Sequence, residues 1–187
     1  MSPTPGLSPE QRSHIITKAL QGVPLPLLFD VLHLTSTLAC PSARDGSYSP
    51  YSLFRVGACL LGQKDGQYTT GANVENASYG VTICAERTAI VKAVTESPNR
   101  RFVGLAIASD LNGVCSPCGL CRQTLREFCP LDMPILLVPA NYSEQTKTVT
   151  AREAKEHGDK GVLVVTTLDE LLPLSFGPED LALPRQG

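Results

Sequence analysis

The stretch TICAERTAI, residues 82–90, contains the start of a helix predicted over 84–96 and also side chains that can take part in chemistry. It places Cys84 two positions before Glu86, with Arg87 next, in a run that is otherwise apolar. A thiol and a carboxylate this close at the start of a helix are either incidental or act together. The rest of the sequence decides between these two interpretations.

Strand-like and helix-like segments alternate on both sides of this helix. The sequence predicts, in chain order, strands at 54–61 and 68–74, the helix at 84–96, a strand at 102–109, a second helix at 117–128, and strands at 133–139 and 162–167. The turn-rich GQKDG at 62–66 favours a hairpin between the first two strands. This order predicts an α/β fold with one central sheet covered by helices.

The flanking segments have a different character. Ser8 as N-cap, Pro9 at the first helical position and Gly22 as a stop predict a helix over 8–22, and an apolar run predicts another over 27–39. Residues 1–7 are expected to be disordered. Residues 140–160 are polar and charged throughout, which predicts a surface insertion, with one or two helical turns in TAREAKEHG at 150–158. We expect residues 1–187 to form a single domain.

The composition excludes several classes of protein. Of 187 residues, 42% are apolar and 18% charged, with a net charge of −2 and no basic run. A nucleic-acid polymer is therefore not expected as a partner, because nothing supplies the release of counterions from phosphates. The N-terminus lacks a signal-peptide pattern, and no apolar run reaches the roughly 18 residues that span a bilayer. We expect a cytoplasmic protein, with passive entry to the nucleus possible, and no membrane partner.

Seven cysteines carry most of the chemical information. An odd number in a reducing compartment argues against a disulfide framework and leaves metal binding, catalysis or burial. Cys118 and Cys121 stand three apart behind Ser116, the predicted N-cap, and Pro117, so they share one face of a helix N-terminus. A C-x-x-C pair alone also fits a redox site or a zinc knuckle.

Cys84 distinguishes between these alternatives. If the helix that it opens points at the same place, three thiolates converge where helix dipoles favour negative charge. Three sulfur ligands leave the fourth tetrahedral position of a zinc ion open, as in catalytic rather than structural sites. Glu86 would stand beside that position without being a ligand.

The combination of C-A-E, a gap of about thirty residues and P-C-x-x-C is a zinc-deaminase signature. Three segments extend the likeness: GANVENASYGVTICAERTAIVKAV at 71–94, SPCGLCRQTLREF at 116–128 and LLPLSFGPEDL at 171–181. Together they resemble the cytidine deaminase family, of the small, three-cysteine, homotetrameric type. The resemblance implies a three-layer α/β/α sandwich with a central mixed five-stranded sheet and one Zn²⁺ per subunit. It also implies deamination of cytidine and 2′-deoxycytidine, with release of ammonia, in pyrimidine salvage.

The reaction itself requires groups of this kind. Replacement of the C4 amino group needs a nucleophile at neutral pH, and zinc would lower the pKa of bound water to roughly 7. One carboxylate beside the metal can move the water proton to N3 and to the leaving amine, and we assign this role to Glu86. Arg87 would offset the excess negative charge of three thiolates by donating to the sulfur atoms.

The resemblance also implies substrate contacts. Asn73 and Glu75 match the pair that holds the ribose hydroxyls, and Phe54 matches an aromatic residue that lines the base pocket. The backbone amide of Ala85 and the carbonyl of Ser116 match the groups that read the pyrimidine edge. Phe176 matches an aromatic residue that reaches into a neighbouring subunit's site, and Tyr51 and Tyr79 match residues at subunit contacts.

Several residues depart from the pattern or stand outside it. The family usually has Pro at the position of Arg55, whose charge either enters the pocket rim or turns outward. The segments 22–49 and 140–160 are longer than is usual in the family. The other thiols and the imidazoles are expected to hold no metal: Cys40, Cys59, Cys115, Cys129, His14, His33 and His157.

Two alternatives to a cytidine deaminase remain. One is an enzyme of the same chemistry on another aminopyrimidine, against which the Asn73 and Glu75 pair argues. The other is a structural zinc or nucleic-acid-binding module, which would need a fourth protein ligand and a basic, aromatic face. The sequence contains neither of these features.

Overall fold

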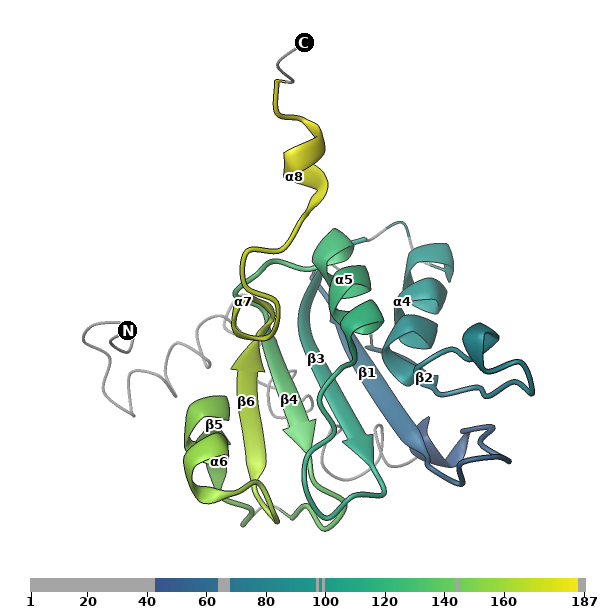
Figure 1. Cartoon of the computed structure of the whole chain (residues 1–187), viewed down its shortest axis with the longest axis vertical. Helices are drawn as coiled ribbons and strands as arrows, with labels where there is room; N and C mark the ends of the chain where they lie inside the picture. The colour runs from purple at the N-terminus through teal and green to yellow at the C-terminus, as the bar shows by residue number, and fades with distance from the viewer. Residues whose placement is uncertain (1–42, 64–67, 97, 99, 144, 185–187) are drawn as a thin grey trace.

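The computed structural model describes residues 43–63, 68–96, 98, 100–143 and 145–184 (Figure 1). The predictions for 1–7, 8–22 and 27–39 lie outside the described residues. Within them, one mixed sheet forms the centre of the fold, which confirms the predicted α/β class.

The sheet has six strands in the order β2-β1-β3-β4-β6-β5. Their bounds are β1 Val56–Gly62, β2 Tyr68–Ala72, β3 Phe102–Ser109, β4 Pro134–Val138, β5 Thr148–Thr150 and β6 Leu163–Thr167. β1 pairs antiparallel with β2 and β3, and β4 with β6, whereas β3–β4 and β5–β6 are parallel. The predicted hairpin and the five predicted strands are therefore present, together with one strand that was not predicted.

The additional strand lies within 140–160. β5 is only three residues long and pairs with β6 at the sheet edge, and α6, Ala151–His157, follows it directly. Thr150 and Glu153 form a capping box at the start of α6, and Gly158, with a φ of 95°, follows its end. The helical turns predicted in 150–158 are thus confirmed. The strand escaped prediction because three residues in a polar stretch are too few to show alternation.

The central strands are apolar without alternation because both faces of the sheet are covered. All seven residues of β1 are buried, and so are all but one of the eight in β3. One face carries Leu60, Ile107 and Ile135, and the other carries the smaller cluster of Cys59, Ala106 and Leu136.

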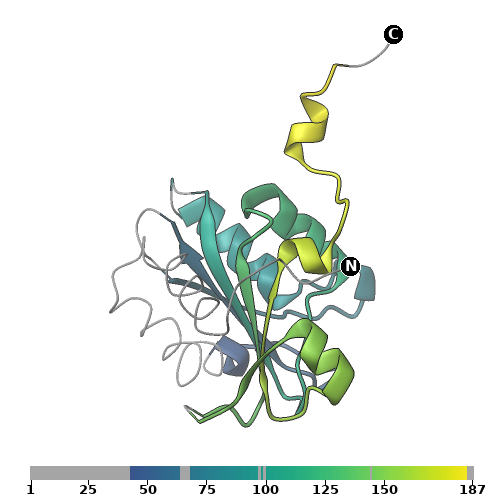
Figure 2. The ribbon, with the colours of Figure 1, turned by 90° about the vertical axis from the view of Figure 1, so that its left-hand side faces the viewer.

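Helices α4, Ala85–Glu96, and α5, Gly119–Phe128, lie side by side on the first of these faces, with α7, Leu168–Leu171, beyond them (Figures 1 and 2). Ile90 of α4, Leu125 of α5 and Leu168 of α7 join the same core cluster. The second helical layer of the expected sandwich stays a prediction, since the segments predicted as further helices, 8–22 and 27–39, lie outside the described residues.

The pairing of β1 with β2 and the packing of α4 on β2 bring the N-terminus of α4 close to the sheet. A Cβ at Gly71 in β2 would stand 2.4 Å from both the Ala85 carbonyl oxygen and the Ala89 nitrogen. Only a residue without a side chain allows helix and strand to approach this closely.

The remaining elements are a 3₁₀ turn at Tyr79–Val81 and α8, Pro178–Leu181, on a C-terminal segment that projects beyond α5 (Figure 1). None of the helices in the described part of the chain is long and apolar enough to cross a membrane.

Candidate active site

Three thiols meet between the N-termini of α4 and α5. Cys84 directly precedes α4, Cys118 is the N-cap of α5, and Cys121 is buried in its first turn. The Sγ atom of Cys118 lies 3.8 Å from that of Cys84 and 3.5 Å from that of Cys121. All three sulfur atoms lie within 4.8 Å of one another.

This spacing fits zinc. Tetrahedral coordination with Zn–S bonds of about 2.3 Å places sulfur ligands roughly 3.8 Å apart, which the measured separations approach. Among the residues that the structure describes, no fourth His, Cys, Asp or Glu joins the group. The donor set therefore fits a zinc ion that keeps one position for water or substrate, and the three predicted ligands are brought together.

The N-cap of α5 differs from the prediction. The helix begins at Gly119 with Cys118 as N-cap, and not behind Ser116. The reason is Arg122, whose Nε donates to the Pro117 carbonyl at 2.7 Å and whose Nη2 donates to the Ser116 hydroxyl at 3.2 Å. Its Nη1 also donates to the Leu171 carbonyl at 2.7 Å. Through these bonds a side chain of α5 holds residues 116–117 in place. The sequence did not predict this role of Arg122.

The electrostatics of the site favour a thiolate at Cys84. Hydrogen bonding from the Cys121 thiol, and then from Arg87, lowers the pKa of Cys84 to about 5. The same bond raises the pKa of Cys121, because its thiol keeps the shared proton. Nη2 of Arg87 lies 3.8 Å from the Cys84 sulfur and donates to the Thr82 carbonyl at 3.0 Å. Arg87 thus points to the group of three thiols rather than to solvent. Of these thiols, Cys84 is the one that loses its proton first as the pH rises.

Glu86 is the buried carboxyl group of this site. It is the second residue of α4 and only 4% exposed. Burial raises its pKa, and the nearby Cys84 adds to that effect. A carboxyl group that holds a proton more readily than usual suits proton transfer at neutral pH.

The neighbouring thiols have the opposite character. Burial raises the pKa of Cys115 to about 11 and that of Cys129 to about 12. Neither belongs to the group of converging sulfur atoms. Both thiols therefore stay protonated near neutral pH, and Cys40 and the two histidines at 14 and 33 lie outside the described residues.

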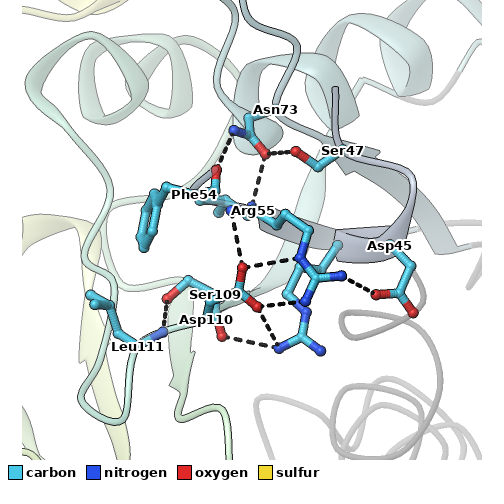
Figure 3. Close-up of polar contacts among 10 residues, drawn as sticks. Asp45, Ser47, Phe54, Arg55, Asn73, Ser109, Asp110 and Leu111 are labelled. Carbon is cyan, nitrogen blue, oxygen red and sulfur yellow. Dashed lines mark hydrogen bonds and ion pairs between the residues drawn. The ribbon is translucent and has the colours of Figure 1, made fainter. Parts of the chain in front are cut away.

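The two residues predicted to hold ribose lie just after β2, and their side chains bind the loop before β1. The Asn73 Oδ1 accepts from the Ser47 hydroxyl at 2.6 Å and the Val56 amide at 2.8 Å, and its Nδ2 donates to the Phe54 carbonyl at 2.9 Å (Figure 3). Nδ2 carries a second hydrogen that can serve a hydroxyl group. The sequence showed no signal for these loop contacts, which join residues far apart in the chain.

Glu75 holds the other end of this loop. Its carboxylate accepts from the Tyr51 amide at 2.9 Å, the Ser52 amide at 3.2 Å and the Ser52 hydroxyl. The bond from this hydroxyl lowers the pKa of Glu75, so the side chain is a carboxylate at neutral pH. Asn73 and Glu75 therefore shape the loop that carries Phe54.

The other predicted contact residues lie in different surroundings. Ala85 is fully buried at the start of α4, and Ser116 is exposed two residues before Cys118. Phe176 is 58% exposed on the projecting C-terminal segment, where its carbonyl accepts from Gln123 of α5 at 3.0 Å. Tyr51 and Tyr79 are also exposed and meet edge to face, with ring centroids 6.1 Å apart.

Arg55 turns away from the ring of Phe54. Its guanidinium pairs with Asp110 at 2.9 Å and with Asp45 at 3.0 Å (Figure 3). The second of the two expected directions, outward, is therefore the one found.

A mixed sheet with three converging cysteine thiols and a buried glutamate at the N-termini of two helices defines the class of zinc-dependent deaminases. Comparison with known proteins agrees. The family model of the cytidine and deoxycytidylate deaminase zinc-binding region matches residues 33–137. A cytidine deaminase from Mycobacterium tuberculosis is 48% identical over 149 residues, which are 77% of this chain and 89% of that protein. One from Halalkalibacterium halodurans is 43% identical over 139 residues, covering 74% and 89%.

Solved structures give the same result. The crystal structure of cytidine deaminase from Burkholderia pseudomallei matches with a TM-score of 0.62 and 34% identity, over 77% of this chain and 98% of that one. That of the M. tuberculosis enzyme matches with a TM-score of 0.55 and 33% identity, over 74% and 92%. This chain belongs to the cytidine deaminase family.

Proposed function

We propose that this protein hydrolyses cytidine and 2′-deoxycytidine to uridine and 2′-deoxyuridine with release of ammonia, a reaction of pyrimidine salvage. The observation that carries the proposal is the group of Cys84, Cys118 and Cys121, whose spacing leaves one zinc position open, next to the buried Glu86 in sequence. Zinc, when bound there, acts as a Lewis acid that lets water attack at neutral pH.

Glu86 moves the protons of the reaction. It takes a proton from the attacking water and delivers it to N3 of the base as the new C–O bond forms at C4. The proton of the new C4 hydroxyl then passes through the same carboxylate to the amino group, the C4–N bond breaks, and ammonia leaves as the C4 carbonyl forms. The burial that raises the pKa of Glu86 supports this double use, because the buried carboxyl group takes up a proton more readily than an exposed one.

The chain's other residues orient the nucleoside. In this proposal the Ala85 amide and the Ser116 carbonyl bind the pyrimidine edge, and Phe54 lines the base pocket. Asn73 and Glu75 bind the ribose hydroxyls, which their remaining donor and acceptor capacity supports. Arg87 tunes the thiolates through its contact with Cys84.

We further propose a homotetramer with one zinc ion per subunit, in which Phe176 completes a neighbour's site. Large apolar side chains that are exposed in the single chain support this assembly. They include Tyr51, Leu53, Tyr79, Leu174 and Phe176. A cytosolic location is also proposed, since a reducing compartment keeps the ligand thiols of the site available to zinc.

The direct test is the loss of cytosine absorbance when purified protein is mixed with cytidine, and separately with deoxycytidine. Turnover should disappear after removal of zinc with a chelator and return when zinc is added back. A zinc-loaded protein that deaminates neither nucleoside would contradict the proposal and would direct attention to other aminopyrimidines.

A further inference from the structure

Side chains hold Phe54 and Arg55, the two residues that lead into β1, and also bind the amide of Val56, its first residue. Asn73 binds the Phe54 carbonyl and the Val56 amide, at 2.9 and 2.8 Å. Asp110 accepts from the amide between them, that of Arg55, at 3.2 Å. Leu53, directly before, has a φ of 55°, which a β-carbon disfavours, so the surroundings must hold this turn in place.

Asp110 binds both the backbone and the side chain of Arg55. Its Oδ2 accepts from the Arg55 amide and also from Nε at 3.0 Å, while Oδ1 accepts from Nη2 at 2.9 Å (Figure 3). A carboxylate that meets a guanidinium in this two-pronged manner has a fixed orientation. Asp110 is itself placed by the end of β3, because Ser109 pairs with Val56 in the register of β1 and β3.

Arg44 adds a second cation to this carboxylate. Its Nη1 lies 3.4 Å from Oδ1 of Asp110 and donates to the Ser109 carbonyl at 3.2 Å. Asp45 balances the charge by pairing with Arg55 at 3.0 Å. Arg55 and Asp45 are exposed enough that such ion pairs contribute little to global stability. What this arrangement fixes is the local path of the backbone.

The direction of Phe54 depends on that path. Figure 3 shows the Phe54 ring and the Arg55 guanidinium pointing to opposite sides of the chain, as successive side chains do in extended backbone. An anchor on Arg55 therefore sets the side on which the ring of Phe54 stands.

We propose that Asp110 is a positioning residue that sets the placement of Phe54, and so the fit of the pyrimidine base, by holding the amide and guanidinium of Arg55. This inference rests on the proposed function, in which Phe54 lines the base pocket. Asp110 touches no reacting atom in this account, and its effect on the reaction passes through Arg55 and Phe54.

The test compares Asp110→Ala, Asp110→Asn and Arg55→Ala with the wild type in cytidine turnover and thermal unfolding. In Asp110→Ala, KM should rise about tenfold while kcat changes by less than about threefold. The reason is that a displaced Phe54 ring would weaken binding of the base. Asp110→Asn keeps an oxygen that can accept from the Arg55 amide, so its KM should lie between that of the wild type and that of Asp110→Ala. The matched control is Asp45→Ala, which removes only the exposed partner of Arg55 and should leave KM unchanged.

The double variant of Arg55→Ala and Asp110→Ala should have a KM no higher than that of Asp110→Ala alone, since both changes break one contact. If Asp110→Ala does not fold, Arg55→Ala and Asp110→Asn carry the test, and both should raise KM.

Two outcomes would overturn the inference while leaving the proposed function intact. In one, the wild type is active and the KM of Asp110→Ala is the same as that of the wild type. In the other, the Asp110 variants lose kcat and melting temperature together with no selective rise in KM. Lack of turnover by the zinc-loaded wild type would instead overturn the proposed function, and this inference with it.

Discussion

Cys115 and Cys118 are only three residues apart, yet their different surroundings give the two thiols different chemical properties. Cys118 caps α5 and meets two other sulfur atoms, whereas Cys115 is partly buried with a pKa raised to about 11. A C-x-x-C pattern can be drawn with either thiol, and the sequence distinguished them through the family resemblance and through the position of Cys115 before the predicted helix. Between the two thiols, Arg122 binds the Pro117 carbonyl and the Ser116 hydroxyl. No pattern in the sequence predicted these bonds.

Substitution of these two thiols should therefore have unequal effects. We expect Cys118→Ser to lose zinc, since it removes one of three ligands, and Cys115→Ser to keep one zinc ion per chain. Elemental analysis of the purified variants measures both. Loss of zinc from Cys115→Ser, with retention in Cys118→Ser, would assign the ligands the other way.

Arg87 acts on the same cluster through its contact with Cys84. Arg87→Gln should weaken zinc binding or turnover by about 10- to 100-fold, as removal of a group that supports a metal ligand usually does. Competition with a coloured zinc chelator measures the affinity. Lys92→Gln is a suitable control, because Lys92 lies on the same helix and donates instead to the Thr70 carbonyl. Equal losses in the two variants would mean that Arg87 has no special role.

At the scale of elements, the sequence predicted the interior of the fold better than its edges. The helix expected at 84–96 appears as Ala85–Glu96, and the strand at 102–109 as Phe102–Ser109, since long apolar runs leave few alternatives. The first strand begins at Val56 rather than 54, because Phe54 and Arg55 bind side chains of distant residues instead of a strand. Such contacts depend on the finished fold and leave no local pattern in the sequence.

The approach of α4 to β2 gives a prediction at this scale. Gly71→Ala should destabilise the protein by about 1–3 kcal/mol, because the new methyl group would meet the backbone of α4 and the helix must shift. Unfolding in denaturant measures the difference. Gly80→Ala is the control, since a Cβ there meets nothing within 4 Å. Equal stability of Gly71→Ala and the wild type would show that the contact yields without cost.

At the scale of the whole molecule, the C-terminal segment projects from the rest of the fold (Figure 2). It is bound to α5, yet the side chain of Phe176 is exposed. Arg126 of α5 also bonds to Ser175 at 2.9 Å and pairs with Glu179. The segment is thus fixed on both sides of Phe176 within its own subunit. This arrangement suits a ring that serves a neighbouring site, which the sequence alone indicated only by resemblance.

Subunit mixing tests that assembly. Chains with Glu86→Gln and chains with Phe176→Ala, each weakly active, should regain turnover when they are unfolded and refolded together, because one supplies Glu86 and the other supplies the ring. A mixture of Glu86→Gln and Cys118→Ser chains should not recover, since each defect lies within its own chain's site. Activity equal to the sum of the separate variants would place Phe176 outside the neighbour's site.

The measurement that bears most directly on the account is zinc content and cytidine turnover on one preparation of Glu86→Gln. The account predicts a full complement of zinc, because Glu86 lies outside the group of metal-binding sulfur atoms. It also predicts turnover lower by at least about a hundredfold, because the proton carrier is gone. Zinc-loaded Glu86→Gln protein that deaminates cytidine at the wild-type rate would contradict it.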